Sequence, residues 1–443
     1  MLNRSRFSYV LDNFGGGLLT PFNRHMPLVV IGGGVSGITV AVEAAASGVE
    51  VVLVEAGPVL GGRMLRTHQN YPKLNSSSSD LEMHLRRLRS NPRITVLTSA
   101  DALSIDGVRG NFKVKVRLNP RYVKDNCTSC DKCAQVCPVE IDDQHNYSMQ
   151  KTKAIFRIPG TGNSPAYTID RSSCMGAECG KCVEVCGDRA IDMDEQPKEI
   201  VLASGSIVLA TGWDPYDAAK IINLGFGRVP NVISNVMMER LVAADGPTGG
   251  KILRPSDRKE AKNIAFVQCA GSRDHEHLPY CSSICCLVSL KQATYVRDAY
   301  PDSRITVIYT DITNPCPGRY DKFLAKVIDD DKIKYMQGKV SMISEDADTD
   351  GVALSVNALR GVGCGVPTEI KADMAVLATG MVPKILSNVL REVMVLDKHG
   401  FMNPESQQEG IYITGTAKFP FDVTSSMLDA TGTAIRTIQR IRQ

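Results

Sequence analysis

A glycine-rich segment between two apolar runs is the feature of this 443-residue chain that most restricts its fold. The first run, residues 27–31, reads as a short strand, and the alanine-rich residues 38–47 behind the glycines have helical character. Three glycines in the pattern G-x-G-x-x-G separate them: Gly32, Gly34 and Gly37. A second apolar run, 50–54, ends at Glu55. This order predicts a βαβ unit that binds a dinucleotide.

Each residue of that pattern has a physical reason. The first glycine permits the tight turn, the second lets the pyrophosphate approach the backbone, and the third lets the helix pack on the strand. The helix amides then bind phosphate, and the acid, Glu55, holds the ribose hydroxyls. A glycine-rich turn without a ligand is the alternative, but strand, helix, acid and spacing all agree here.

Composition excludes several classes of protein. Lys and Arg number 51 against 48 Asp and Glu, so nothing indicates a nucleic-acid binder. No stretch approaches the roughly 18 apolar residues that cross a bilayer, so we expect any membrane link to run through a partner. Residues 1–25 make a poor signal peptide and are expected to be a partner-binding arm or an upstream start before Met26. The 14 cysteines cluster at short spacings, which indicates metal binding in a reducing compartment.

Eight of the cysteines form two sets in a turn-rich segment that interrupts the strand pattern from about 121 to 191. The first set has the spacing C-x2-C-x2-C-x3-C and comprises Cys127, Cys130, Cys133 and Cys137. The second has the spacing C-x4-C-x2-C-x3-C and comprises Cys174, Cys179, Cys182 and Cys186. These spacings favour two [4Fe-4S] clusters over structural zinc or disulfides, with each fourth cysteine ligating the other cluster. We therefore expect Cys186 to complete the first cluster and Cys137 the second.

Several stretches resemble flavoproteins with two dinucleotide-binding domains. Gly61-Gly62-Arg63 resembles their second flavin phosphate contact, 207–212 and 375–380 their Ala-Thr-Gly crossover segments, and 411–416 their late strand near the ribityl chain. The resemblance implies FAD as the cofactor. The flavin-binding residues expected on this basis are Gly32, Gly34, Ser36, Gly37, Glu55, Ala56, Gly62, Arg63, Ala102, Thr211, Gly212, Gly415, Asp422 and Ser425. Residues 419–427 open the last helix, and their amides either favour negative charge on the reduced flavin or simply cap that helix.

A second strand–helix unit begins at residue 262 and lacks a phosphate loop. After the apolar run 263–267 the chain reads Gln268-Cys-Ala-Gly-Ser-Arg273, with one glycine instead of three. This argues against direct oxidation of NAD(P)H. The same segment carries a third set of cysteines, either a metal site or buried thiols without metal: Cys269, Cys281, Cys285 and Cys286. The isolated Cys316 and Cys364 are expected to be structural.

The stretches 268–274 and 280–286, together with the inserted cysteine-rich segment, resemble the flavin-binding A subunit of heterodisulfide reductase. Residues 122–137 and 174–182 resemble the A subunit of the quinone-interacting membrane-bound oxidoreductase still more closely. The resemblance covers essentially all residues after Met26. It implies a third [4Fe-4S] cluster on the third cysteine set, with backbone strain at the adjacent Cys285 and Cys286. One departure is 71–80, where cysteines are expected in such relatives and this chain has serines.

The expected fold is α/β: a two-dinucleotide-binding-domain, disulfide-reductase-like flavoprotein with an inserted 2[4Fe-4S] ferredoxin domain. Asp80 is expected to cap a helix over 80–90, and further helices are expected over 287–299 and after Thr424. The expected domain ranges are an arm at 1–25, an FAD domain at 26–118, 196–260 and 381–443, the insert at 119–195, and an NAD(P)H-domain-like unit at 261–380.

The resemblance implies an oxidoreductase component in which redox cofactors, not side chains, perform the chemistry. It would pass electrons between the quinone pool and a cytoplasmic sulfur-metabolism reductase, adenylylsulfate reductase. Its partners would be two further subunits, one with flavin and iron–sulfur centres and one with haem and quinone contact in the membrane, which places the chain at the cytoplasmic face of the membrane. The alternatives are a heterodisulfide-reductase-like flavoprotein that bifurcates electron pairs, a self-contained NAD(P)H or thiol-disulfide oxidoreductase, and a non-catalytic scaffold.

Overall fold

The computed structural model describes residues 26–71, 73–158, 167–312, 318, 320–359, 367–384 and 394–442. The expected N-terminal arm, Cys316 and Cys364 lie outside the described residues. The chain divides into two compact units. Unit 1 contains the described residues of Met1–Leu65, Ser78–Trp213 and Pro383–Gln443, and unit 2 those of Arg66–Ser77 and Asp214–Val382.

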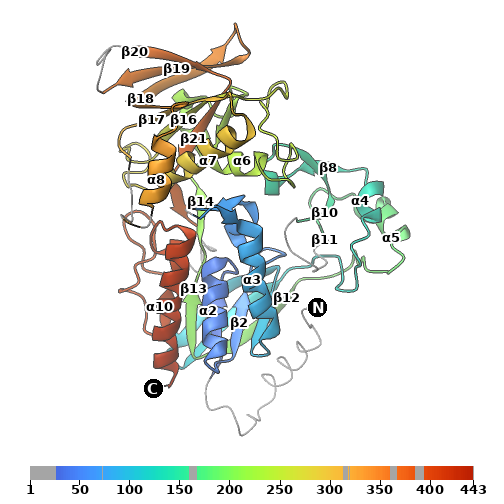
Figure 1. Ribbon diagram of the computed structural model, residues 1–443. Coiled ribbons are helices and arrows are strands. Elements are labelled where there is room, and N and C mark those ends of the chain that lie inside the picture. The colour runs from blue at the N-terminus through green and yellow to red at the C-terminus, as the bar shows by residue number, and fades with distance from the viewer. Residues whose placement is uncertain are drawn as a thin grey trace. The chain divides into compact units, whose positions relative to one another are not determined.

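A parallel sheet forms the centre of unit 1. Its strand order is β23 (Ile411–Ile413), β13 (Ser206–Leu209), β1 (Leu28–Ile31), β2 (Val51–Val54) and β5 (Ile94–Leu97). All side chains of β1 and β2 are buried, as expected for a parallel strand covered on both faces. Helices α2 (Val35–Ala46), α3 (Ser77–Ser90) and α10 (Val423–Arg442) cover one face, on which Leu28 and Leu53 lie (Figure 1).

A second sheet covers the other face. It is antiparallel, in the order β12 (Lys198–Ser204), β7 (Asn111–Leu118) and β6 (Ala100–Val108). Burial alternates along β7, where Phe112, Val114 and Val116 point into the core that also contains Val29. Unit 1 is therefore built in three layers, with the parallel sheet between helices and antiparallel strands.

The cysteine-rich segment folds around its own small core. It contains two hairpins and several short helices: α4 (Lys132–Val136), β8 (Glu140–Asp142), η2 (Gln144–Asn146), β9 (Lys151–Lys153), β10 (Ile155–Arg157), β11 (Tyr167–Ile169), η3 (Gly176–Glu178) and α5 (Lys181–Glu184). Ile155, Tyr167 and Ile169 form the centre, and six cysteines pack against them. Val123 and Ile191 form an antiparallel bridge, so the two ends of the segment meet.

Unit 2 is built on a mixed sheet. Its strand order is β15 (Val232–Ser234), β21 (Met374–Thr379), β16 (Asn263–Ala270), β17 (Arg304–Tyr309), β18 (Ile333–Asp346), β19 (Gly351–Ala358) and β20 (Pro367–Ala372). The pairs from β15 to β18 are parallel, and β18, β19 and β20 are antiparallel. The helices are α6 (Asn235–Leu241), α7 (Cys285–Ala299) and α8 (Asp321–Ile328), of which α6 and α7 contact β21 (Figure 1).

The division between the units differs from the expected boundary at 260/261 and lies at Trp213/Asp214. The reason is that β15 pairs in parallel with β21, which assigns residues after Asp214 to the second sheet. Residues 66–77 also cluster with unit 2, including β3 (Gln69–Asn70) and β4 (Asn75–Ser76). The remaining short elements are η1 (Gly62–Arg66), β14 (Trp213–Pro215), η4 (Ala218–Lys220), η5 (Ile222–Leu224), β22 (Met381–Pro383) and η6 (Gly415–Ala417).

Two helix starts also differ from expectation. Helix α3 begins at Ser77, so Asp80 lies in its first turn rather than at the N-cap. A carboxylate there still interacts favourably with the helix dipole. Helix α7 begins at Cys285, two residues before the expected start at Leu287. The third cysteine set therefore reaches into a helix.

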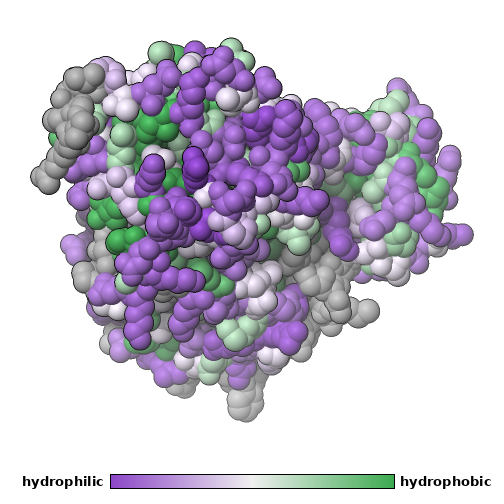
Figure 2. All heavy atoms as spheres, turned by 45° about the horizontal axis from the view of Figure 1, so that its top comes forward, coloured by the Kyte–Doolittle hydropathy of each residue, from purple (hydrophilic) through white to green (hydrophobic). Residues whose placement is uncertain are grey.

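No helix within the described ranges is long and apolar enough to cross a membrane. Figure 2 shows a face dominated by hydrophilic side chains, on which hydrophobic atoms form small separate patches.

Candidate flavin and iron–sulfur sites

The glycine loop after β1 adopts a shape that only glycine permits. Gly32 has φ +111°, and a Cβ there would lie 2.3 Å from the carbonyl oxygen of Ala210. A Cβ on Gly37 would lie 1.8 Å from the carbonyl oxygen of Gly32. Gly34 is the N-cap of α2 and supplies no side-chain cap, so the first amides of α2 lack a side-chain acceptor from it. This is a cradle that phosphate oxygens fit.

A second glycine turn lies against the first. The amide of Gly61 donates to the carbonyl oxygen of Gly33 at 2.8 Å, and a Cβ on Gly62 would lie 3.0 Å from Cα of Gly34. The two turns therefore lie in close contact, and a side chain on Gly62 would press against the backbone of Gly34.

Arg63 follows the second turn and is fixed by protein groups. It donates from Nε to the carbonyl oxygen of Trp213 at 3.1 Å and from Nη1 to Oη of Tyr147 at 2.9 Å. Its guanidinium also lies over the Trp213 ring. These contacts set the direction of Arg63, whose contact with flavin phosphate remains a prediction.

Glu55 is anchored at the end of β2. Its Oε2 accepts the Gly33 amide at 2.6 Å and its Oε1 accepts the Gly57 amide at 2.7 Å. Each oxygen keeps acceptor capacity, which suits the expected bonds to ribose hydroxyls. Ala56 beside it is exposed, whereas Ala102 is a buried core residue of β6.

The carboxyl ends of β13 and β23 bring the other expected flavin residues to the same edge of the sheet. Thr211 follows β13, and its buried Oγ1 has no hydrogen-bond partner among the described residues. Gly212 and Gly415 have φ +78° and +63°, and a Cβ on Gly415 would lie 2.2 Å from Oγ of Ser36. An orphaned hydroxyl beside a cradle that tolerates no Cβ fits a bound flavin. The residues present are thus compatible with FAD.

The start of α10 supports the simpler of the two expected roles for residues 419–427. Oδ1 of Asp422 accepts the Ser425 amide at 2.6 Å, and the Asp422 carbonyl oxygen accepts the Ser426 amide at 2.9 Å. Asp422 therefore caps α10.

Sequence reasoning missed Asp429, which holds the segment after β23. Its Oδ2 accepts the Gly415 amide at 2.8 Å and Oγ1 of Thr414 at 3.0 Å, and its other oxygen forms an ion pair with Lys418. Nothing in the local sequence marks this acid, because its partners precede the helix and lie up to 15 residues earlier in the chain. It is a positioning residue for Gly415.

The two cysteine loops of the insert share a backbone geometry. The residue before α4, Asp131, has φ +65°, and the residue before α5, Gly180, has φ +61°. The second residue after each first cysteine donates its amide to the thiol sulfur: Ser129 to Cys127 and Gly176 to Cys174, both at 3.4 Å. The two extra residues of the second loop therefore leave its turns in place.

Several thiols of the insert influence one another's pKa, and the expected ligand sets stay a prediction. Burial raises the pKa of Cys133 to about 11, with further contributions from Cys127 and Cys130. Burial also raises the pKa of Cys182, with contributions from Cys174 and from Cys137 of the other loop. This proximity agrees with the crossed ligand set, in which Cys137 joins the second loop. Since burial opposes the thiolate form, bound iron would offset that effect by its own charge.

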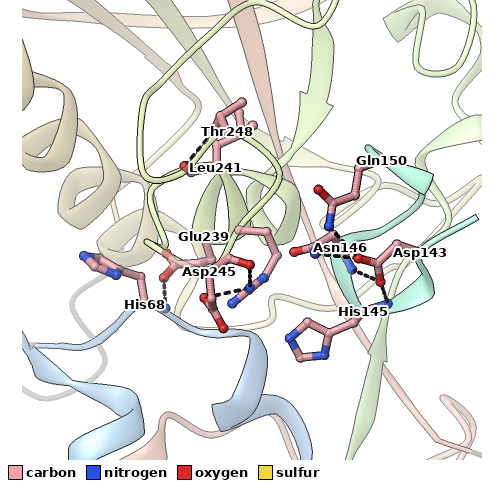
Figure 3. Close-up of polar contacts among 10 residues, drawn as sticks. His68, Asp143, His145, Asn146, Gln150, Glu239, Leu241, Asp245 and Thr248 are labelled. Atoms are coloured by element: carbon pink, nitrogen blue, oxygen red, sulfur yellow. Dashed lines mark hydrogen bonds and ion pairs between the residues drawn. The ribbon is translucent and has the colours of Figure 1, made fainter. Parts of the chain in front are cut away.

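A carboxylate network stiffens the hairpin that follows the first loop (Figure 3). Asp143 accepts the amides of His145 and Asn146 through Oδ1, and the side-chain amides of Asn146 and Gln150 through Oδ2, the latter two at 2.7 Å.

Figure 3 also shows Glu239 of unit 2, which accepts the backbone amide of His68 at 3.0 Å.

The third cysteine set gathers at the carboxyl end of β16. The pairing of β16 with β21 shifts between Val267 and Ala270, and Cys269 in this bulge has φ +56°. The pKa of the Cys285 thiol is raised by burial first and then by the charges of Cys286, Cys269 and Cys281. Burial likewise raises the pKa of Cys269 to about 11. Four close thiols of this kind suit the ligand set of a [4Fe-4S] cluster.

The backbone strain lies elsewhere than expected. Cys285 and Cys286 are in the first turn of α7. The left-handed residues between Cys269 and Cys286, glycine apart, are Cys269, Arg273 and Ser283, with φ +56°, +54° and +64°. A helical start presents consecutive side chains to one end of the sheet without strain, so the bend is made before the helix. Within the described part of the chain, no group of three or more histidine, cysteine or acidic side chains is placed to hold a single metal ion.

Comparison with known proteins agrees with this interpretation. A family model described as FAD dependent oxidoreductase matches residues 27–86. The A subunit of "H(2):CoB-CoM heterodisulfide,ferredoxin reductase" from Methanothermobacter thermautotrophicus is 35% identical over 421 residues, covering 92% of this chain and 63% of the relative. The second iron-sulfur A subunit of "CoB--CoM heterodisulfide reductase" from Methanopyrus kandleri is 36% identical over 420 residues, with the same coverage. This chain thus spans less than two thirds of the length of these curated relatives.

Solved structures show the same fold. Thioredoxin reductase of T. acidophilum superposes with a TM-score of 0.52 at 13% identity, covering 95% of this chain and 100% of that chain. Thioredoxin reductase of Lactococcus lactis gives 0.52 at 13% identity, covering 94% and 99%.

The fold has two dinucleotide-binding-type units and a cysteine-rich insert, which confirms the expected fold class, and the matches are to FAD-dependent and heterodisulfide reductase oxidoreductases. More narrowly, the chain is similar over 92% of its own length to A subunits of heterodisulfide reductase, which confirms the resemblance seen in residues 268–286.

Proposed function

We propose that this chain is the FAD and iron–sulfur electron-transfer component of a membrane-associated complex that connects the quinone pool with a cytoplasmic sulfur-metabolism reductase, adenylylsulfate reductase. The observation that carries the proposal is the set of four neighbouring thiols at the end of β16. A nicotinamide-dependent enzyme needs a glycine-rich phosphate loop at that place. Here the loop has one glycine, so electrons arrive through clusters instead.

Separate sets of residues would bind the flavin and the iron–sulfur clusters. The glycine loop, Glu55 and Thr211 would bind and orient FAD, which exchanges two electrons when bound. The insert thiols would hold two [4Fe-4S] clusters, on Cys127, Cys130, Cys133 and Cys186 and on Cys174, Cys179, Cys182 and Cys137. Cys269, Cys281, Cys285 and Cys286 would hold a third. Four thiolates per cluster match the usual ligand count.

The partners in this proposal are two further subunits, one with flavin and iron–sulfur centres and one with haem and quinone contact in the membrane, with the chain at the cytoplasmic face of the membrane. Support comes from residues 122–137 and 174–182, which resemble the corresponding stretches of the A subunit of quinone-interacting oxidoreductase. The serines of 71–80, where relatives are expected to have cysteines, also favour a role distinct from that of heterodisulfide reductase.

The relatives favour a second candidate function. Those at 31–36% identity carry the names of heterodisulfide reductases, several of which include ferredoxin or hydrogen. In that case the chain would split electron pairs from its flavin between two partners.

Iron and flavin analysis of anaerobically purified protein tests the proposal. We expect one FAD and about twelve iron atoms per chain, falling to about eight in Cys285→Ser, since each cubane site contributes four. About eight iron atoms in the parent would remove the third cluster. Dithionite should bleach the flavin and NADPH alone should not; rapid bleaching by NADPH would refute the proposal. A second assay separates the two candidates. Reduction of the flavin by a naphthoquinol in the presence of the membrane partners supports the first candidate, and reduction by reduced ferredoxin supports the second.

A further inference from the structure

Arg273 is a cationic side chain in the segment that carries the third cysteine set. Burial raises the pKa of the Cys269 thiol, and the positive charge of Arg273 acts in the opposite direction. Arg273 also lies 3.8 Å, Nη1 to Oδ2, from the carboxylate of Asp311. The carbonyl oxygen of that same Asp311 accepts from Sγ of Cys286 at 3.6 Å. Arg273 is therefore next to a residue, Asp311, that contacts one of the four sulfurs directly.

The backbone holds Arg273 in this position. The residue has φ +54°, a left-handed conformation that a non-glycine side chain adopts only when its surroundings enforce it. Its amide donates to the carbonyl oxygen of Tyr280 at 3.1 Å, and the amide of Asp274 donates to the carbonyl oxygen of Leu278 at 3.0 Å. Tyr280 in turn donates from Oη to the carbonyl oxygen of Met381 at 2.8 Å. Strained residues that their surroundings hold in place cluster at functional sites, and Arg273 is such a residue.

The neighbouring acids offset the positive charge of Arg273 only weakly. Asp274, next in the chain, is paired with Lys339 at 3.0 Å. The contact of Arg273 with Asp311 is longer, and the Asp311 side chain is 68% exposed, so solvent screens that ion pair. By contrast, Cys269 is partly buried, and charge interactions are stronger where water is excluded.

We propose that Arg273 sets the reduction potential of the site formed by Cys269, Cys281, Cys285 and Cys286. The inference rests on the third cluster of the proposed function and adds the residue that tunes it. When the site accepts one electron from the flavin or from a reduced partner protein, its net charge becomes more negative by one. No bond or proton need change. Arg273 stabilises that added charge, so it raises the affinity of the site for the electron.

The test is an EPR-monitored titration of the whole, anaerobically purified chain with dithionite. In Arg273→Gln we expect the ratio of reduced to oxidised third site at a fixed potential to fall at least tenfold, which is about 59 mV for a one-electron couple. Arg273→Lys, which keeps the charge but not the planar fork, should recover part of the loss. Asp311→Asn should shift the ratio the other way. Lys339→Gln is the matched control, because it removes a positive charge that pairs with the neighbouring Asp274 without touching a thiol.

The iron content and the reduction potential of the third site together distinguish a missing cluster from a cluster whose potential does not depend on Arg273. If the parent contains about eight iron atoms, the third cluster and the role of Arg273 both fail. If it contains about twelve and Arg273→Gln shifts the third site no more than Lys339→Gln does, the cluster stands and the role of Arg273 is refuted. If Arg273→Gln loses iron, the Arg273→Lys and Asp311→Asn potentials decide: opposite shifts support the inference and no shift overturns it.

Discussion

Replacing Gly37 by alanine should expel FAD, because the added methyl group has no space. A Cβ there would lie 1.8 Å from the carbonyl oxygen of Gly32 and 3.3 Å from Cβ of Ala210. The first contact is about 1.6 Å short of ordinary van der Waals separation. The obstacle is backbone rather than a flexible side chain, so the turn between β1 and α2 must open. Overpacking of this kind costs about 1–3 kcal/mol, against about 1 kcal/mol gained from the helix propensity of alanine.

An opened turn also moves the amides that would bind phosphate. A displacement of about 1 Å can cost a hundredfold in a positioned site, so we expect flavin affinity to fall at least tenfold, about 1.4 kcal/mol. The assay is FAD per chain after gel filtration, with the urea midpoint of flavin release. Gly432→Ala in α10 is the control, since nothing lies within 4 Å of its added Cβ. It should keep its flavin and gain about 0.5–1 kcal/mol of stability. Parental flavin content and midpoint in Gly37→Ala would refute the reasoning.

Glu239→Gln should destabilise unit 2 by about 3–5 kcal/mol, because it leaves the charge of the buried Lys291, now 2.9 Å from Glu239, without its counter-ion. Equal urea midpoints for this variant and the more exposed Glu82→Gln, expected to cost about 0–1 kcal/mol, would contradict this. Burial raises the pKa of Asp143, but its hydrogen bonds lower the pKa by more, so the folded value lies below the usual one. The stability that ionised Asp143 contributes to the folded insert is therefore lost as the pH falls below about 4, through the folded pKa. Asp143→Asn should therefore reduce the difference in insert stability between neutral and acid pH, measured by iron release. Asp429→Asn should weaken FAD binding about tenfold by loosening the loop after β23; an unchanged fluorescence titration would exclude that role.

The βαβ unit could be predicted from sequence because its signals are local. Strand, glycine turn and helix lie within 20 residues, and the constraint at Gly37 comes from Gly32, five residues away. The insert was predictable for the same reason, since each set of cysteines lies on one short loop. The structure adds that the two loops share one turn in spite of the two extra residues. A left-handed residue precedes the short helix in each loop, Asp131 in the first and Gly180 in the second.

The features that sequence reasoning missed depend on distant pairing. The unit boundary moved to Trp213/Asp214 because β15 pairs with β21, more than 130 residues later, and a short buried strand carries no mark of its partner. Asp429 was missed because it caps nothing in its own helix and holds a loop instead. The start of α3 was misplaced because three serines before Asp80 continue the helix, although serine usually favours its N-cap.

The third cysteine set shows how local and distant constraints combine. Four thiols can be read from the sequence, but not how the adjacent Cys285 and Cys286 reach one site, and strain between them was the natural expectation. The structure distributes the task differently: α7 starts at the pair, while the left-handed residues lie before it, at Cys269 in the β16 bulge, at Arg273 and at Ser283. A bulge turns a side chain without disturbing the rest of a strand. The parallel part of the unit 2 sheet can therefore keep the strand pairing of a dinucleotide-binding domain while the edge that would bind phosphate presents cysteines instead.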